Sequence, residues 1–213
     1  MSSKQLMDCR QCDRLADFLV TVKTRHPDYY AKPVPAFGDV KSKLLIIGLA
    51  PGMHGANRTG RPFTGDYAGV LLYQTLHKFG LSSHHESISA DDGLVLSGCR
   101  ITNAVKCLPP ENKPKPDEVR QCGSYLVAEI DGFITAGGKA LLVLGTVAHQ
   151  AALRALDLKL KDFPFGHGVV HSLPNDLILY DSYHCSRYNT QTKRLTTKMF
   201  EQVFERIKKD QID

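Results

Sequence analysis

Apolar residues along this chain fall into two alternating patterns. Short, continuous apolar runs of strand length stand at about residues 43–49, 99–105, 140–145, 168–173 and 177–181. Between and around them, apolar residues recur at helical spacing over about residues 9–25, 67–79, 117–136, 146–156 and 193–209. Strands that are apolar throughout are buried on both faces, and intervening helices join such strands in parallel. The pattern therefore predicts an α/β fold with helices on both faces of a mostly parallel sheet.

Composition narrows the class of protein. The 213 residues are 42% apolar and 23% charged, as in ordinary soluble proteins, and we expect a single domain over residues 1–213 and a monomer. There is no apolar run of membrane-spanning length, and the first residues lack the apolar core of a secretory signal. These features favour a cytoplasmic protein with reduced thiols. The formal net charge of +5 permits a polyanionic partner without requiring one.

The segment GLAPGMHGANRTGRPFTGDYAG, residues 48–69, contains six glycines and follows directly on an apolar run. So many glycines indicate sharp turns or a close approach of the backbone to a ligand. In open α/β sheets, ligands bind at the carboxyl ends of the strands. The segment is therefore the first candidate for a functional site.

Cysteine spacing suggests a second site. Cys9 and Cys12 form a CxxC pair, and fourteen residues separate Cys107 from Cys122. Four thiolates can enclose zinc or an iron–sulfur cluster. The wide second pair does not match a zinc ribbon, and the alternative is one CxxC with two unrelated buried cysteines. Spacing alone does not exclude Cys99 and Cys185 as ligands.

Three segments and the cysteine pattern together resemble the iron–sulfur uracil-DNA glycosylases, in particular the type B, or family 5, branch. The segments are GLAPGMHGANRTGRPFTGD, ITNAVKCLPPENKPKP and SYHCSRYNTQTKRLT, and they lie in the order of the family. The resemblance implies a three-layer αβα fold with a four-stranded, largely parallel sheet. It also implies a [4Fe-4S] cluster on Cys9, Cys12, Cys107 and Cys122, with a structural role.

The resemblance assigns roles in a pocket that receives a base rotated out of the DNA duplex. Phe63 matches the phenylalanine that stacks on the base, and Asn103 matches the amide that reads the uracil edge. His184 matches the donor that stabilises the departing uracil anion, although Cys185 stands where the family usually has proline. The alternatives are a core role for Phe63, a turn-capping role for Asn103 and a structural role for His184.

The residue that positions the attacking water is open at this point. Other uracil-DNA glycosylases carry an acid or amide where this chain has Leu49 and Ala50. Asn57, Asp66 and His54 are the candidates from the same loop, and Asp66 equally suits the N-cap of the following helix. Ala50, Gly52 and His54 are also expected to line the base pocket.

Basic and polar residues near these motifs are candidate contacts to DNA phosphates, with a solvated surface as the alternative for each. They are Arg58, Arg61, Lys106, Arg187 and Arg194. The loop of residues 186–192 resembles the family's segment that enters the duplex where the base leaves, and Tyr188 or Arg187 is the candidate to fill that gap. The resemblance implies hydrolysis of uracil from DNA, with hypoxanthine and xanthine as further substrates. The alternative is a non-catalytic module that binds damaged DNA and retains the cluster and the pocket. The absence of a carboxylate near Leu49 and the presence of Cys185 are the features in its favour.

Overall fold

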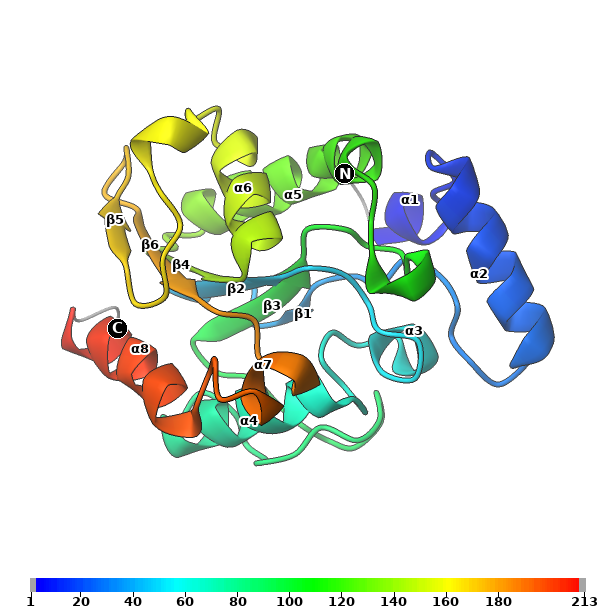
Figure 1. Ribbon diagram of the computed structural model, residues 1–213, viewed down its shortest axis with the longest axis horizontal. Coiled ribbons are helices and arrows are strands. Elements are labelled where there is room, and N and C mark those ends of the chain that lie inside the picture. Colours follow the sequence, from blue (N-terminus) through cyan, green and yellow to red (C-terminus); the bar gives the residue numbers. More distant parts are fainter. Residues whose placement is uncertain (1–2, 211–213) are drawn as a thin grey trace.

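One mixed sheet of six strands lies at the centre of the molecule, which the computed structural model describes over residues 3–210 (Figure 1). In spatial order the strands are β1 (Phe37–Gly38), β3 (Cys99–Asn103), β2 (Leu44–Gly48), β4 (Ala140–Leu144), β6 (Ile178–Ser182) and β5 (Val170–Ser172). The four inner strands are parallel, and the two edge strands β1 and β5 are antiparallel to their neighbours. The α/β class predicted from the apolar runs is confirmed.

The expected strand number of four is wrong, although four strands do form the parallel centre. Strand β5 corresponds to the apolar run at 168–173, which the sequence pattern indicates and the family-based count omits. Strand β1 has two residues and follows Pro33 and Pro35. An element of that length is too short for its apolar periodicity to be recognised.

Helices cover both faces of the sheet, with α5 and α6 on one face and α4 and α8 on the other (Figure 1). Over residues 3–210, none of the helices combines the length and the apolar character needed to cross a bilayer. The helices are α1 (Ser3–Met7), α2 (Asp13–Arg25), α3 (Ala56–Thr59), α4 (Tyr67–Lys78), α5 (Pro116–Thr135), α6 (Thr146–Ala155), α7 (Arg187–Gln191) and α8 (Thr197–Lys209), with 3-10 turns at Pro110–Asn112 and Leu160–Asp162.

The core reflects the alternation of side chains along each strand. In β2, Leu44 and Ile46 pack in the core beneath α4 and α8, whereas Leu45 and Ile47 pack in the core beneath α5 and α6. All four side chains are buried, which explains why β2 reads as a continuous apolar run. Because both faces are covered, ligands reach this sheet at its ends.

All four inner strands end at the same edge, because they are parallel. The glycine-rich loop follows β2, and Asn103 is the last residue of β3. Gly145 follows β4, and His184 stands two residues after β6. The fold therefore brings the three sequence motifs together at the carboxyl edge of the sheet.

Candidate functional site

A pocket of about 750 Å³ opens at the carboxyl edge of the sheet. This volume lies in the range of small-molecule sites in proteins. Its wall comes from the loop between β2 and α4, the end of β3, the β4–α6 junction and the segment after β6. The predicted residues on this wall are Ala50, Gly52, His54, Phe63, Asp66, Asn103, His184, Arg187 and Arg194.

Phe63 and Asn103 meet above Gly48, the last residue of β2. A Cβ atom on Gly48 would lie 2.5 Å from Cζ of Phe63 and would also overlap Oδ1 of Asn103. Only glycine therefore allows the ring and the amide to approach the strand this closely. Phe63 has a φ of 54°, in the left-handed region that non-glycine residues seldom adopt. Such strain is characteristic of functional loops. The Phe63 side chain is 5% exposed, packs in the core beneath α4 and α8, and also lines the pocket.

Asn103 brings an unpaired acceptor to the pocket wall. The residue is 3% exposed, and its Oδ1 is buried without a hydrogen-bond partner. A buried polar atom left unpaired costs about 1–3 kcal/mol. A ligand that donates an N–H group to this oxygen would recover that free energy.

His184 lies next to Phe63 on the pocket wall, with the two rings stacked. The two ring centroids are 5.9 Å apart with an interplanar angle of 28°. Burial lowers the pKa of His184 to about 4, so the ring is neutral at neutral pH and keeps one N–H donor. The side-chain amide of Asn189 donates to the His184 carbonyl oxygen at 2.8 Å. This bond fixes the backbone next to Cys185, which is itself buried in the core.

Asp66 caps a helix and also reaches the pocket wall. One carboxylate oxygen accepts from the Gly69 N–H at 2.9 Å and caps α4, as the sequence suggested. The other oxygen lies against Gly52 and Gly55 in the loop that lines the pocket. Burial raises the pKa of Asp66, and hydrogen bonds from the Gly69 and Ala68 N–H groups partly offset this effect.

Asn57 takes a different position from the one expected. Its side chain is fully buried and neither amide atom has a hydrogen-bond partner, but the residue does not line the pocket. Its role in positioning the water stays a prediction. His54 lines the pocket, and its Nδ1 lies 2.7 Å from the hydroxyl of Tyr29.

Three of the basic residues predicted to contact DNA, Arg58, Arg187 and Arg194, lie at the pocket wall or the surface. Arg187 and Arg194 lie on the pocket wall with their guanidinium groups over the rings of Tyr67 and Tyr183, at 5.0 and 4.7 Å from the centroids. The neighbouring Tyr188 is 70% exposed. Exposed Arg58 donates from Nε to the His54 carbonyl oxygen at 2.7 Å and so supports the loop.

The predicted DNA contacts of Arg61 and Lys106 are wrong, because both side chains are buried in internal ion pairs. Arg61 is 3% exposed and lies 2.6 Å from the carboxylate of Asp92. The Lys106 ammonium is 2.6 Å from both Glu129 and the Thr102 hydroxyl. Neither cation is available to a phosphate.

The four predicted metal-ligating cysteines line one small cavity beside α1 and α5. Cys9 and Cys12 precede α2, which begins at Asp13 rather than at residue 9 as predicted, because Cys12 has the extended backbone of an N-cap. Burial and the nearby Cys122 raise the pKa of Cys12 to about 11, and burial likewise raises the pKa of Cys107 and Cys122. Cys99 and Cys185 lie elsewhere in the core. Burial thus disfavours the thiolate forms of Cys12, Cys107 and Cys122, and a soft cation bound to the sulfurs would stabilise them.

Several residues on the pocket wall have no counterpart in the sequence predictions. Thr146 follows β4 and Tyr183 follows β6, so the rule that ligands bind at strand ends could have found both. Asn189 lies within the third motif, SYHCSRYNTQTKRLT, which assigned it no role, and Phe165 comes from an irregular segment with no recognisable pattern. Their positions depend on tertiary packing.

The fold and the pocket define an α/β protein with a pocket at the carboxyl edge of the sheet, lined by the Phe63 ring, the Asn103 amide and the neutral His184. The family model for the uracil DNA glycosylase superfamily matches residues 35–208. The chain belongs to this superfamily.

Three relatives cover almost the whole chain. The chain is 44% identical over 209 residues to the type-5 uracil-DNA glycosylase of Thermus thermophilus, and the match covers 96% of this chain and 94% of the relative. It is 42% identical to the type-5 uracil-DNA glycosylase of Mycobacterium bovis, over 94% of this chain and 77% of the relative. Identity to the type-5 enzyme of Pyrobaculum aerophilum is 38%, over 97% of this chain and 90% of the relative.

Proposed function

We propose that this chain is a type-5 uracil-DNA glycosylase that hydrolyses the N-glycosidic bond of uracil in DNA and leaves an abasic site. Hypoxanthine and xanthine are further proposed substrates. The observation that carries the proposal is the convergence of Phe63, Asn103 and His184 on one pocket. The family match and the near-complete coverage by type-5 relatives support it.

Recognition begins with rotation of the nucleotide out of the duplex. The flipped base stacks on the ring of Phe63, and the unpaired Oδ1 of Asn103 accepts a hydrogen bond from the uracil N3–H group. Cytosine has no hydrogen on N3, so two acceptors would face each other there. Rejection through unpaired buried groups is the strong form of discrimination.

Bond cleavage places the glycosidic electron pair on the uracil ring and positive charge on the sugar. A neutral His184, whose pKa is lowered to about 4, donates its N–H group to uracil O2 as negative charge develops there. A donor held in a buried pocket stabilises such an anion without reorganisation. The imidazole therefore acts as a hydrogen-bond donor and keeps its proton.

The attacking water is the second half of the reaction. Asp66 brings a carboxylate to the pocket wall, and the oxygen that does not cap α4 lies against the loop glycines. We assign this oxygen to orient the water and accept its proton as the water oxygen bonds to the sugar carbon. The Asp66 carboxylate would thus take the place of the acid or amide that other uracil-DNA glycosylases carry at the positions of Leu49 and Ala50.

The four cysteines are proposed to hold a [4Fe-4S] cluster. All four side chains line one small cavity, and four thiolates are the ligand set of such a cluster. The resemblance to the iron–sulfur branch of the superfamily favours this cluster over a single zinc ion. When bound, the cluster would cross-link the chain before α2 to the chain after β3 and to α5.

DNA binding is assigned to the mouth of the pocket, where Arg187 and Arg194 line the wall and Tyr188 projects into solvent. The two guanidinium groups would contact phosphates and orient the duplex. Tyr188 would fill the space that the rotated base leaves.

The test is direct. The purified protein, with its iron content measured, is incubated with a duplex that contains one deoxyuridine, and alkali then cuts the strand at any abasic site. We expect cutting of the uracil duplex, weaker cutting with hypoxanthine or xanthine, and none with cytosine. Binding of the uracil duplex without any cut strand would contradict the enzyme assignment and favour the non-catalytic module.

A further inference from the structure

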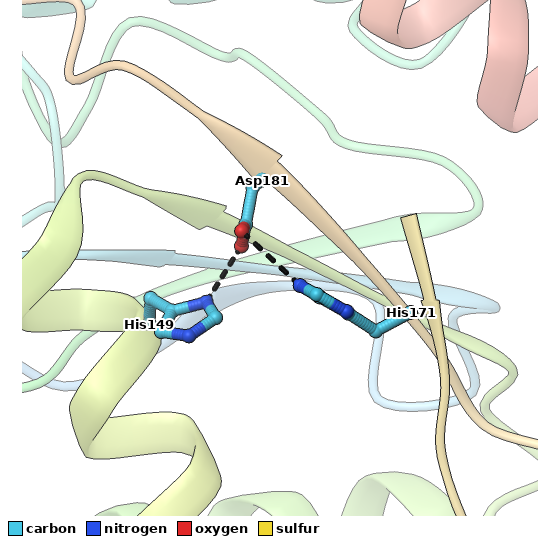
Figure 2. Close-up of side chains that lie close together, drawn as sticks. All are labelled: His149, His171 and Asp181. Carbon is cyan, nitrogen blue, oxygen red and sulfur yellow. Dashed lines mark hydrogen bonds and ion pairs between the residues drawn. The ribbon is translucent and has the colours of Figure 1, made fainter. Parts of the chain in front are cut away.

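Outside the pocket, two histidines and an aspartate from three elements point at one another (Figure 2). His149 lies on α6, His171 on β5 and Asp181 on β6. His171 pairs with Leu179, two residues before Asp181, so His171 and Asp181 lie on the same face of the sheet. Helix α6 places His149 over that face. Three separate segments thus supply two nitrogens and one carboxylate to a single point.

His171 is the one histidine of the group whose Nε2 makes no hydrogen bond. His149 Nε2 lies 2.8 Å from the Phe163 carbonyl oxygen, which can only accept, so this nitrogen carries the hydrogen. His149 Nδ1 is 2.7 Å from one oxygen of Asp181, and His171 Nε2 is 3.5 Å from the other. The side chain of His171 is 10% exposed, and its Nε2 is buried without a hydrogen-bond partner.

We propose that His149, His171 and Asp181 bind a divalent transition-metal ion of the zinc class. All the ligand atoms lie within 4.8 Å of one another. An ion with bonds of about 2.0–2.1 Å in tetrahedral geometry separates its ligand atoms by about 3.3 Å. The two nitrogen–oxygen distances, 2.7 and 3.5 Å, lie on either side of that value.

The chemistry of the donors selects the ion. Two imidazole nitrogens and one carboxylate suit zinc and its neighbours, whereas calcium and magnesium prefer oxygen ligands alone. The bond from His149 Nε2 to the Phe163 carbonyl is the outer-shell contact that metal-binding histidines usually make, and it directs Nδ1 toward the ion. A water molecule entering on the side of His171 would complete four-coordination.

The site is structural rather than catalytic, because none of its three residues lines the pocket. It does hold the pocket wall indirectly. The ring of Phe165, which lies on that wall, is 5.5 Å from the ring of His149. The N–H of Gly166 donates to Asp181 at 3.2 Å. A bound ion would join the edge strand β5 and the segment around Phe165 to the sheet.

Zinc titrations of the full-length protein test the proposal, with iron content measured in parallel so that changes at the cysteines are seen. We expect the wild-type protein to bind about one zinc ion per chain while its iron is retained. His171→Gln should weaken this binding by more than about 100-fold, because it removes one of three ligands. His85→Gln, which changes an exposed histidine outside the group, should bind as the wild type does.

Two further measurements identify the ligands. Cobalt substituted for zinc should show weak visible bands without thiolate charge transfer, and a zinc-soaked crystal of the wild type should give an anomalous peak between the three side chains. The crystal result does not depend on any variant being folded. Equal zinc binding by wild type and His171→Gln, thiolate bands, or a crystal without the peak would overturn the proposal and leave a histidine–aspartate ion pair that needs no metal.

Discussion

Buried polar groups are paired in one region of the molecule and unpaired in another. The first region is the Arg61 network, which comprises Arg61, Thr64, Ser87 and Asp92, and the second is the pocket. In the network, the Arg61 guanidinium lies 2.6 Å from Asp92 and 2.5 Å from Ser87, and its Nε donates to Thr64. In the pocket, Asn103 Oδ1 has no partner.

Both regions include residues of the glycine-rich loop, residues 48–69. The glycine and polar content of this loop therefore does not predict which of its residues are paired. The difference lies in whether the protein itself supplies the partner. Paired groups hold the loop in place, and unpaired groups at a cavity are available to a ligand. By this criterion, changes in the network should lower stability, and changes in the pocket should lower catalysis.

The largest effect is expected for His184→Ala. Loss of the donor to the uracil anion should lower the single-turnover cleavage rate by about 100- to 1000-fold, as for removal of one oxyanion donor. The free energy of unfolding should change little, because the imidazole makes no hydrogen bond that holds the fold. Rates come from alkali-revealed strand cutting under excess enzyme. A variant that cleaves as fast as the wild type would remove His184 from the mechanism.

Arg61→Ala should show the reverse behaviour. It leaves Asp92 largely buried without its cation, and breaking such a pair costs about 3 kcal/mol of unfolding free energy. Urea denaturation measures this loss, and Arg206→Ala, which breaks an exposed pair on α8, should leave stability nearly unchanged. The cleavage rate per folded Arg61→Ala molecule should stay close to that of the wild type. A selective loss of DNA affinity would instead return Arg61 to the list of phosphate contacts.

Asp66→Asn separates the proposed role in water activation from the observed helix cap, since asparagine caps helices as well as aspartate does. The variant should keep its thermal midpoint but lose about 100-fold in cleavage rate, because the amide cannot accept the proton of the water. Asp66→Ala should lose the cap as well, at about 1 kcal/mol. Full activity in Asp66→Asn would leave only the capping role.

The pH dependence of stability tests the burial of His184. Its pKa is about 4 in the folded protein, against 6.5 for the free side chain, so the unfolded chain takes up a proton first as pH falls. Stability is therefore unaffected above pH 6.5 and falls below it, by about 2 kcal/mol at pH 5. The measurement compares unfolding free energies of the wild type and His184→Asn at pH 7 and pH 5. Equal losses in both proteins would mean that His184 is not the group responsible.

How far the sequence predicts the site depends on where the partners of each residue lie. Phe63, Asn103 and His184 occupy strand ends or loops next to strands, so topology alone brings them together. Arg61 and Lys106 stand in equally polar sequence, but their partners Asp92 and Glu129 lie 31 and 23 residues away. No local pattern reveals such pairing, which is why both were predicted as surface contacts.

The same limit applies to the fold and to the proposed metal site. Apolar runs identified the four parallel strands and β5, but the two-residue strand β1 depends on its pairing with β3. His149 and Asp181 are 32 residues apart and come from different elements, so no motif joins them to His171. Such groups are recognisable only when the side chains are placed.

The smallest effect is expected for Asn103→Leu, which replaces the amide by an apolar side chain with the same branching. Removing an unpaired buried acceptor should leave stability unchanged or slightly higher, in contrast to the loss in Arg61→Ala. Cleavage of uracil should fall by about tenfold, equivalent to about 1.4 kcal/mol, since one hydrogen bond to the base is lost. The preference for uracil over cytosine should fall by a similar factor, while affinity for undamaged duplex stays the same. Measured stability and cleavage rates on matched duplexes decide the point, because a marked drop in unfolding free energy would show that Asn103 supports the fold and not the base.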